Sequence, residues 1–533
     1  MKNKPNKKAK IETNQMHIAI SILQKKEEWK LAFFSSLFCY GIAHGYRFMH
    51  CLFSGDALVD VWQNDVAWEI SLGRCFMPIW MFLRGTILTP WLFFSISVIM
   101  ITLTVFFLAD FFEIKSRSAI FLTAAVLSSN LVLTSLNAGF LPWADIYLIV
   151  VFLNVISAWL LWKKESIFSF LAGILLFTLG LGTYQAYVTV AAAMVMLKFL
   201  LELSLGTKCK KVLYRLLRTG IGILISGVVY YISWKTLQKV FGIWTTDGYN
   251  GLADLWNYQN VSFIRLLGKT YYNFFDFFWN PNVFIGLHYQ GKSLGILWVW
   301  LIRGVNIVLL MGLIGYLFYS NRKTKTGIAE RILQIGDFLL LPLGINAICI
   351  LSKGMEHILM VYSFLIPYVF AIKLAFDPLV PERKKQIVRI FAVLSLGTLC
   401  WINAVYSNQI YIRKELQEKA SLSLLTRIVH DIEGMDGYEP GVTQVALSGS
   451  FINSPEIQEP SVFDELTTYG VGDTPLFYYG TEEPFLRYYM HSGILITTVD
   501  PFSDAVKEMP CYPKKGSITY IDDVLVVKIA EWK

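Results

Sequence analysis

The feature that most limits the fold of this chain is a series of apolar stretches, each about twenty residues long. A helix of that length can cross the hydrocarbon core of a membrane, because its backbone hydrogen bonds are all made internally. About eleven such stretches lie near residues 31–50, 90–112, 118–136, 144–162, 166–183, 186–205, 217–235, 294–319, 335–352, 357–376 and 387–406. The sequence therefore predicts an all-α polytopic membrane protein.

The composition agrees with this prediction. Hydrophobic residues make up 55% of the chain and charged residues only 16%, against about 25% charged residues in soluble proteins. Such a surface needs lipid to cover it. The net charge of +8 comes from short Lys and Arg clusters between the apolar stretches and not from one basic patch, so nucleic acid is not expected as a partner.

The positions of these basic clusters predict an orientation. They occur at Lys115 and Arg117, Lys163 and Lys164, Lys208 to Arg218, Arg322 to Lys325, and Arg383 to Arg389. All of them fall on one side of the membrane if the basic N-terminus is cytoplasmic, as positive charges usually do. We therefore expect a cytoplasmic segment at 1–30, a transmembrane domain at 31–406, and large outer loops at 53–90 and 235–293.

The last part of the chain, 407–533, is no longer hydrophobic. A helix is expected at Leu416–Ile432, and short strand-like runs follow at Gln444–Leu447, Ile494–Val499 and Ile518–Ile529. Turn-forming Gly and Pro residues separate these runs, a pattern typical of a small folded domain. We expect an extracytoplasmic C-terminal α/β domain.

The first outer loop holds the most informative group of polar residues. Its carboxylates and arginines are Asp56, Asp60, Asp65, Glu69, Arg74 and Arg84. Carboxylates beside a membrane surface suit general-base work on a sugar hydroxyl, and nearby arginines suit the binding of a lipid phosphate. In the alternative interpretation these acids are solvated residues that keep the loop out of lipid.

Further polar residues lie at predicted outer helix ends or in short outer loops: Asn137, Asp145, Tyr184, Gln185, Lys353, Glu356 and His357. Ionisable groups at membrane depth are costly unless they are buried and paired, so they are functional candidates. The alternative for each is a helix cap or an interfacial anchor. The seven cysteines are scattered singly, so neither a metal site nor a cofactor is expected.

Several motifs in order carry a family resemblance. They are Ser54-Gly-Asp56, Glu69-Ile-Ser-Leu-Gly-Arg74 with Pro78, Arg84-Gly, Pro90-Trp, Asn137 with Pro142 and Asp145, and Leu181-Gly-Thr-Tyr-Gln-Ala-Tyr187. Over residues 30–405 the chain resembles the bacterial serotype-converting glucosyltransferases of the GtrII family. The resemblance implies a membrane glycosyltransferase of the GT-C type. Such enzymes move a sugar, here expected to be glucose, from a polyprenyl-phosphate carrier to a cell-surface glycan at the outer leaflet.

The resemblance also implies roles for residues. An acid of the first outer loop would be the catalytic base, with Asp56 as the first candidate and Glu69 as the second. From the residues themselves we expect Arg74, Arg84 or Lys353 to stabilise the departing lipid phosphate, and Asp60, Asn137, Asp145, Tyr184 and Gln185 to help to bind the substrate.

The implied partners are the lipid-linked donor, the glycan acceptor, membrane lipids, a flippase and a carrier-loading glycosyltransferase. Two rival functions stay open, a flippase or transporter for lipid-linked sugars and a polysaccharide polymerase. A transporter often has internal repeats, and none is visible in this sequence.

Overall fold

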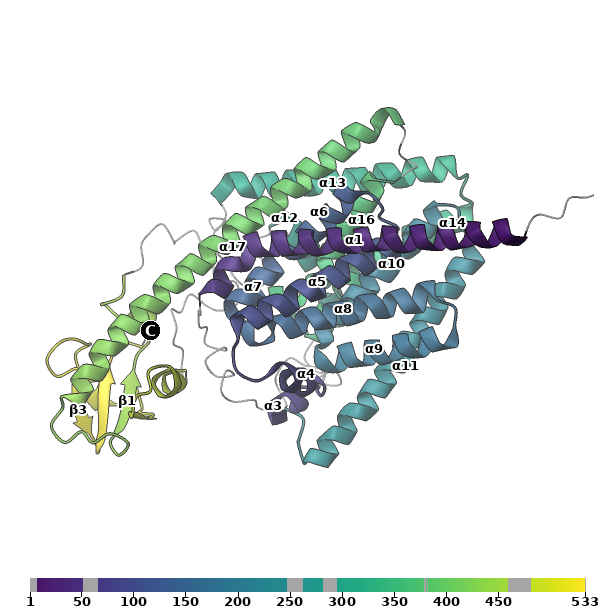
Figure 1. Ribbon diagram of the computed structural model, residues 1–533. Helices are drawn as coiled ribbons and strands as arrows, with labels where there is room; N and C mark the ends of the chain where they lie inside the picture. Colours follow the sequence, from purple (N-terminus) through teal and green to yellow (C-terminus); the bar gives the residue numbers. More distant parts are fainter. Residues whose placement is uncertain are drawn as a thin grey trace, which may run out of the picture.

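The computed structural model describes residues 7–50, 66–246, 262–280, 295–377, 380, 382–458 and 481–532. These residues form a helical bundle to which a small sheet is attached (Figure 1). The helices of the bundle are α1 (Lys7–Met49), α3 (Val66–Ser71), α4 (Met77–Arg84), α5 (Pro90–Phe112), α6 (Arg117–Ser128), α7 (Leu131–Gly139), α8 (Leu141–Lys163), α9 (Ile167–Thr183), η1 (Gln185–Tyr187), α10 (Val188–Ser204), α11 (Cys209–Phe241), α12 (Phe263–Trp279), α13 (Gly295–Lys323), α14 (Ile328–Ile345), α15 (Ala347–Leu351), η3 (Ile358–Met360), η4 (Tyr362–Leu365), α16 (Ile366–Ala375) and α17 (Glu382–Glu433).

Six helices among the described residues are long and apolar enough to cross a membrane. They are Pro90–Phe112, Leu141–Lys163, Gln185–Ser204, Cys209–Phe241, Trp298–Lys323 and Arg383–Glu433. The pair α6 and α7, bent by 40°, makes a seventh if it is counted as one crossing. The chain therefore has the character of a multi-pass membrane protein, with fewer clear spans than the eleven expected.

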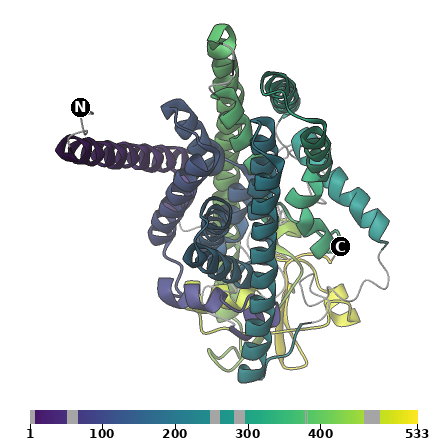
Figure 2. The same ribbon diagram turned by 90° about the vertical axis from the view of Figure 1, so that its right-hand side faces the viewer.

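The difference arises where predicted spans are short or interrupted. The stretch 166–183 is α9, with 17 residues, and 335–352 breaks at Asn346 between α14 and α15. The stretch 357–376 is divided into η3, η4 and α16. The stretch 31–50 is only the last part of α1, whose N-terminal part projects beyond the bundle (Figure 2). A hydropathy pattern measures apolar length and does not show where a helix breaks inside an apolar stretch.

The break between α6 and α7 shows how a polar side chain caps a helix. The Asn130 side chain accepts a hydrogen bond from the Leu133 backbone N–H at 3.0 Å and so caps α7. Its amide nitrogen donates to the carbonyl oxygen of Leu127 at 3.0 Å, at the end of α6. One asparagine thus satisfies groups that both helix ends would leave unpaired in an apolar interior.

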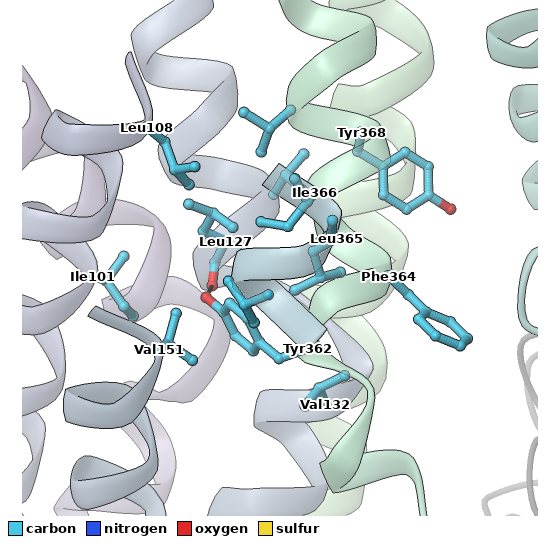
Figure 3. Close-up of a cluster of buried hydrophobic side chains, with 14 of the residues drawn as sticks. Ile101, Leu108, Leu127, Val132, Val151, Tyr362, Phe364, Leu365, Ile366 and Tyr368 are labelled. Carbon is cyan, nitrogen blue, oxygen red and sulfur yellow. Dashed lines mark hydrogen bonds between the residues drawn. The ribbon is translucent and has the colours of Figure 1, made fainter. Parts of the chain in front are cut away.

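The centre of the bundle is a closely packed apolar core. Figure 3 shows Tyr362, Leu365 and Ile366 of the η4–α16 segment among side chains of α5, α6, α7 and α8. The Tyr362 hydroxyl donates to the carbonyl oxygen of Leu127 at 2.9 Å. The short helices after residue 357 therefore lie inside the bundle and not around it.

The longest helix, α17, joins the bundle to the C-terminal sheet. It runs beside the end of α1, where the Tyr411 hydroxyl lies 2.6 Å from His44 Nδ1. Leu424, Leu425, Ile428 and Ile432, further along α17, pack with the apolar face of the sheet. The expected helix at Leu416–Ile432 is therefore the end of one continuous helix of 52 residues.

The sheet has four strands, β1 (Gln444–Ser448), β2 (Leu495–Thr497), β3 (Ile518–Ile521) and β4 (Val524–Lys528), in the order β2-β1-β4-β3. The strand β1 pairs in parallel with β2 and β4, and β3 pairs antiparallel with β4. The predicted strand regions are confirmed, but Ile518–Ile529 is a hairpin and not one strand. Asp522 and Asp523 have φ angles of 47° and 65°, and a positive φ at both central residues is what a type I′ hairpin turn requires.

Candidate active site

The short helices α3 and α4 form a compact unit that is docked on the ends of α9 and α11. The Phe76 N–H donates to the carbonyl oxygen of Gly182 at 2.8 Å, and the Trp80 indole N–H donates to the Thr183 hydroxyl at 2.8 Å. From α11, Tyr230 donates to the carbonyl oxygen of Gly73 and Trp234 donates to that of Ile70, at 2.9 and 2.7 Å. The part of the first predicted outer loop that carries α3 and α4 is therefore an ordered part of the bundle.

Two glycines let this unit approach closely. Gly73 has a φ of +83°, and a Cβ there would lie 2.6 Å from the Tyr230 hydroxyl oxygen. A Cβ on Gly182 would lie 2.5 Å from the ring of Phe76 and 3.2 Å from the Cys75 sulfur. All three contacts are shorter than ordinary van der Waals packing, so a side chain at either position must push the α3–α4 unit away.

Gly182→Ala should therefore destabilise the protein by about 1–3 kcal/mol, the usual cost of overpacking, and reduce any activity that depends on the α3–α4 unit. The measurement is thermal unfolding of the purified variant in detergent. Gly227→Ala is the matched control, because Gly227 also lies in a helix but a Cβ there meets nothing within 4 Å. An equal loss of stability in both variants would contradict the close-approach argument.

Glu69 and Arg74 face each other within the docked unit. Glu69 is 4% exposed, and its Oε2 lies 3.4 Å from Arg74 Nη1. The Arg74 guanidinium lies 5.5 Å from the ring centroid of Tyr184, which is stacked on Tyr147 at 3.9 Å. A carboxylate from α3, a cation from the turn after α3, and a stacked aromatic pair from α8 and the residue before η1 are thus brought together.

Gln185, at the start of η1, makes hydrogen bonds to the α3–α4 unit and to α11. Its amide nitrogen donates to the Leu72 carbonyl oxygen at 3.4 Å and to the Tyr230 hydroxyl at 3.3 Å. These contacts hold the α3–α4 unit against η1 and α11. A role in substrate binding stays a prediction for this residue.

The second charged pair of the site joins α4 to α8. Arg84 Nη1 donates to Asp145 Oδ1 at 2.7 Å and to the Pro142 carbonyl oxygen at 2.6 Å. The two side chains are 5% and 0% exposed, and the Arg84 guanidinium lies 4.1 Å from the ring centroid of Phe93. Arg84 Nε and Asp145 Oδ2 have no hydrogen-bond partner among the described residues. The ion pair is therefore buried and joins α4 to α8, and each partner has one atom without a hydrogen bond among the described residues.

Asn137 lies in a third polar cluster, where the end of α1 meets α7. Its carbonyl oxygen accepts a hydrogen bond from Arg47 Nε at 2.7 Å, and its amide lies 3.2 Å from the Tyr40 hydroxyl. Arg47 is 1% exposed and His44 is fully buried. Tyr40 and Tyr411 were not predicted from the sequence. The signal that could have indicated this cluster is the presence of His44 and Arg47 inside the apolar stretch 31–50, because ionisable residues there must be buried and paired.

The loop that contains Lys353 lies between α15 and η3 in the chain and contacts α12. Lys353 has a φ of 52°, and the His357 ring lies 5.5 Å from that of Phe140, at the start of α8. Glu356, 1% exposed, accepts hydrogen bonds from Asn273 at 2.7 Å and from Asn346 at 3.3 Å. Burial raises the pKa of Glu356 to about 7, although hydrogen bonds from both asparagines and the charge of Lys269 oppose the shift.

This raised pKa predicts a pH dependence of stability. Between about pH 4.5 and 7 the folded protein keeps a proton on Glu356 that the unfolded chain releases, so stability falls as pH rises through this window. Glu356→Gln, which imitates the protonated side chain, should match the wild type near pH 5 and exceed its Tm near pH 8. Thermal unfolding at both pH values checks this. A difference between the two proteins that does not change with pH would contradict it.

The structure thus brings most of the predicted residues to one end of the bundle. Glu69, Arg74 and Tyr184 form one cluster, Arg84 and Asp145 a second, and Asn137 a third. Asp56, Asp60 and Asp65 lie outside the described residues. Within the described ranges, no group of three His, Cys, Asp or Glu side chains is placed to hold a metal ion.

Comparison with known proteins adds one finding. The family model described as glucosyl transferase GtrII matches residues 57–372, more than half of the 533 residues. The matched range includes both charged pairs and the Lys353 loop, and it begins just after Asp56. No curated protein and no solved structure matches the sequence.

Proposed function

This chain belongs to the glucosyl transferase GtrII family, and from that premise we propose that it transfers glucose from a polyprenyl-phosphate carrier to a cell-surface glycan. The observation that carries the proposal is the family match, because it covers the stretch in which Glu69, Arg74 and Arg84 occur. Glycosyltransferase activity follows from the family. The donor, the acceptor class and the mechanism are our proposal.

The proposed chemistry is one displacement at the anomeric carbon. The acceptor hydroxyl gives its proton to a carboxylate, its oxygen bonds to the anomeric carbon, and the bond from that carbon to the lipid phosphate oxygen breaks. Glu69 is the best-supported base among the described residues, because it is buried beside a cation and an aromatic stack. Arg74 is placed to stabilise the negative charge that develops on the departing phosphate. Asp56, the first candidate from the sequence, lies outside the described residues and stays a candidate base.

We place this end of the bundle at the outer leaflet and the C-terminal sheet outside the cell. The support is the charge pattern, since the lysine and arginine clusters all lie at or beside the helix ends at the other end of the bundle, where positive charges mark the cytoplasm. The exposed apolar side chains of α4, Phe82 at 83% and Leu83 at 69%, suit a helix that rests at the membrane interface. We keep the GT-C architecture and the eleven crossings as part of this proposal.

The ion pairs at the cytoplasmic end favour the enzyme over a transporter. Lys198 pairs with Glu113 at 3.0 Å, Lys163 with Asp110 at 2.8 Å, and Arg215 with Glu202 at 2.9 Å. These pairs join α10 to the end of α5, α8 to α5, and α11 to α10. An alternating-access carrier must open this end, and breaking several partly buried ion pairs would oppose the opening.

The deciding experiment uses the purified full chain in proteoliposomes with polyprenyl-phosphate-glucose and a candidate wall or envelope glycan. Glucose transferred to the glycan supports the proposal. Movement of the lipid across the bilayer without transfer would support the flippase, and lengthening of a lipid-linked glycan would support the polymerase. Either of these results would overturn the proposal.

A further inference from the structure

An apolar cleft lies between α12, α13, α14 and α16, away from the charged pairs of the candidate site. Its volume is about 490 Å³, within the range of pockets that hold small ligands. Phe275 and Phe278 of α12, Leu310 of α13 and Leu341 of α14 contribute to its wall. Phe275 and Leu310 are 58% and 47% exposed, so the cleft opens on the side of the bundle that would face lipid.

The polar groups in and near the cleft are paired within the protein. Asn321 and Gln334 join α13 to α14 by a hydrogen bond of 2.7 Å near their connection. Asn306, in the wall, donates to the Phe278 carbonyl oxygen at 2.7 Å and accepts from the Tyr368 hydroxyl at 2.8 Å. A hydrocarbon chain can therefore enter from the lipid side without leaving these polar groups unpaired.

One cation lies at the rim of the cleft. Arg303 donates through Nε to the Trp279 carbonyl oxygen at 2.8 Å and through Nη2 to Asn280 Oδ1 at 2.5 Å. Its guanidinium lies 4.9 Å from the rings of both Trp279 and Trp300. Nη1 makes no hydrogen bond to any residue in the described part of the chain. The side chain is thus fixed in place, with one edge available to an anion.

The depth of Arg303 suits a lipid head group. It lies about 28 Å along α13 from Arg322, at 1.5 Å per residue, which is close to the thickness of the hydrocarbon core. Arg322 belongs to a basic cluster at the end proposed to be cytoplasmic. Arg303 therefore comes at the level of the outer leaflet head groups, directly above an apolar cleft.

We propose that this cleft binds the isoprenoid chain of a polyprenyl phosphate, with the phosphate held by Arg303. The site lies apart from Glu69 and Arg74, so it is a separate docking site for the charged or spent carrier. The chemistry favours this occupant over an ordinary phospholipid. The cleft wall contains five phenylalanines, Phe274, Phe275, Phe278, Phe338 and Phe370, whose rings suit a chain with methyl branches and double bonds. One arginine, Arg303, is among the lining residues and is available for one phosphate. The choice of carrier rests on the proposed function.

The test measures binding of geranylgeranyl phosphate to the purified full chain in detergent by native mass spectrometry. Leu310→Trp, which fills the cleft, should weaken binding about tenfold or more, and Arg303→Gln should weaken it by about tenfold through loss of a charged hydrogen bond. Val308→Trp is the matched control, since Val308 is on the same helix with 44% exposure but is not part of the cleft wall. Ile307→Trp replaces Leu310→Trp if that variant does not fold.

Two further ligands show whether the phosphate group contributes to binding and whether an ordinary phospholipid binds in the same cleft. Geranylgeraniol, which lacks the phosphate, should bind to the wild type more weakly than geranylgeranyl phosphate does. Its affinities for the wild type and for Arg303→Gln should be equal. Dioleoyl phosphatidylglycerol should not compete at equal concentration. Equal weakening by Leu310→Trp and Val308→Trp, or equal competition by the phospholipid, would overturn the inference. The assay contains no sugar and no acceptor, so its result is independent of whether glucose transfer is observed.

Discussion

Replacing Glu69 by glutamine should lower the rate of sugar transfer by about 10²–10⁴-fold, the usual contribution of a general base, while the protein stays folded. Glutamine has nearly the same shape and can still accept a hydrogen bond from Arg74, but it cannot take a proton from the acceptor hydroxyl. The measurement is the initial rate of transfer with polyprenyl-phosphate-glucose. We expect kcat to fall and the KM for the donor to change little, as for a group that acts in the transition state.

The matched control for this variant is Glu415→Gln. Glu415 is a largely buried carboxylate at the same end of the bundle, and it pairs with His50 at 3.3 Å and with Lys419 at 2.7 Å. It lies on α17, away from the α3–α4 unit, so its neutral variant should keep transfer. A similar loss in both variants would mean that the effect is structural. Full activity of Glu69→Gln would exclude Glu69 as the base and leave Asp56 as the next candidate.

Much of the bundle could be predicted from the sequence, because the length of an apolar stretch is a one-dimensional property. The helices α5, α8, α10 and α11 lie close to the predicted spans. The breaks were harder to predict, since a single polar residue inside an apolar stretch, such as Asn130, can cap a new helix. The hairpin at Asp522 and Asp523 was missed for a similar reason, because an Asp-Asp pair is a weaker turn signal than Asn-Gly or Asp-Gly.

The candidate site shows a related limit. The sequence indicated which residues were costly to place near a membrane, and Glu69, Arg84 and Asp145 are indeed buried. It could not indicate which of them pair. Arg84 and Asp145 lie on different helices, and only packing in three dimensions brings them to 2.7 Å. Glu356 was noted beside Lys353, but its burial against Asn273 of α12 depends on a contact between distant segments.

Replacing Arg84 by methionine should destabilise the protein by about 3–5 kcal/mol, the usual cost of leaving one charge of a buried pair without its partner. Methionine removes the hydrogen bonds to Asp145 Oδ1 and to the Pro142 carbonyl oxygen but keeps an unbranched apolar side chain near Phe93. A large fall in Tm in detergent is the expected result. An unchanged Tm would show that the buried pair does not hold α4 against α8.

The double variant Arg84→Met with Asp145→Leu separates the structural role of the pair from a role in binding. Replacing both partners of a buried ion pair by apolar residues is often nearly neutral, so this variant should recover a substantial part of the lost Tm. If the pair only fixes α4 against α8, glucose transfer returns together with stability. If Arg84 also binds the lipid phosphate, the double variant is stable but its KM for the donor stays high. Since the Arg84 Nε donor has no hydrogen-bond partner among the described residues, we expect the second result.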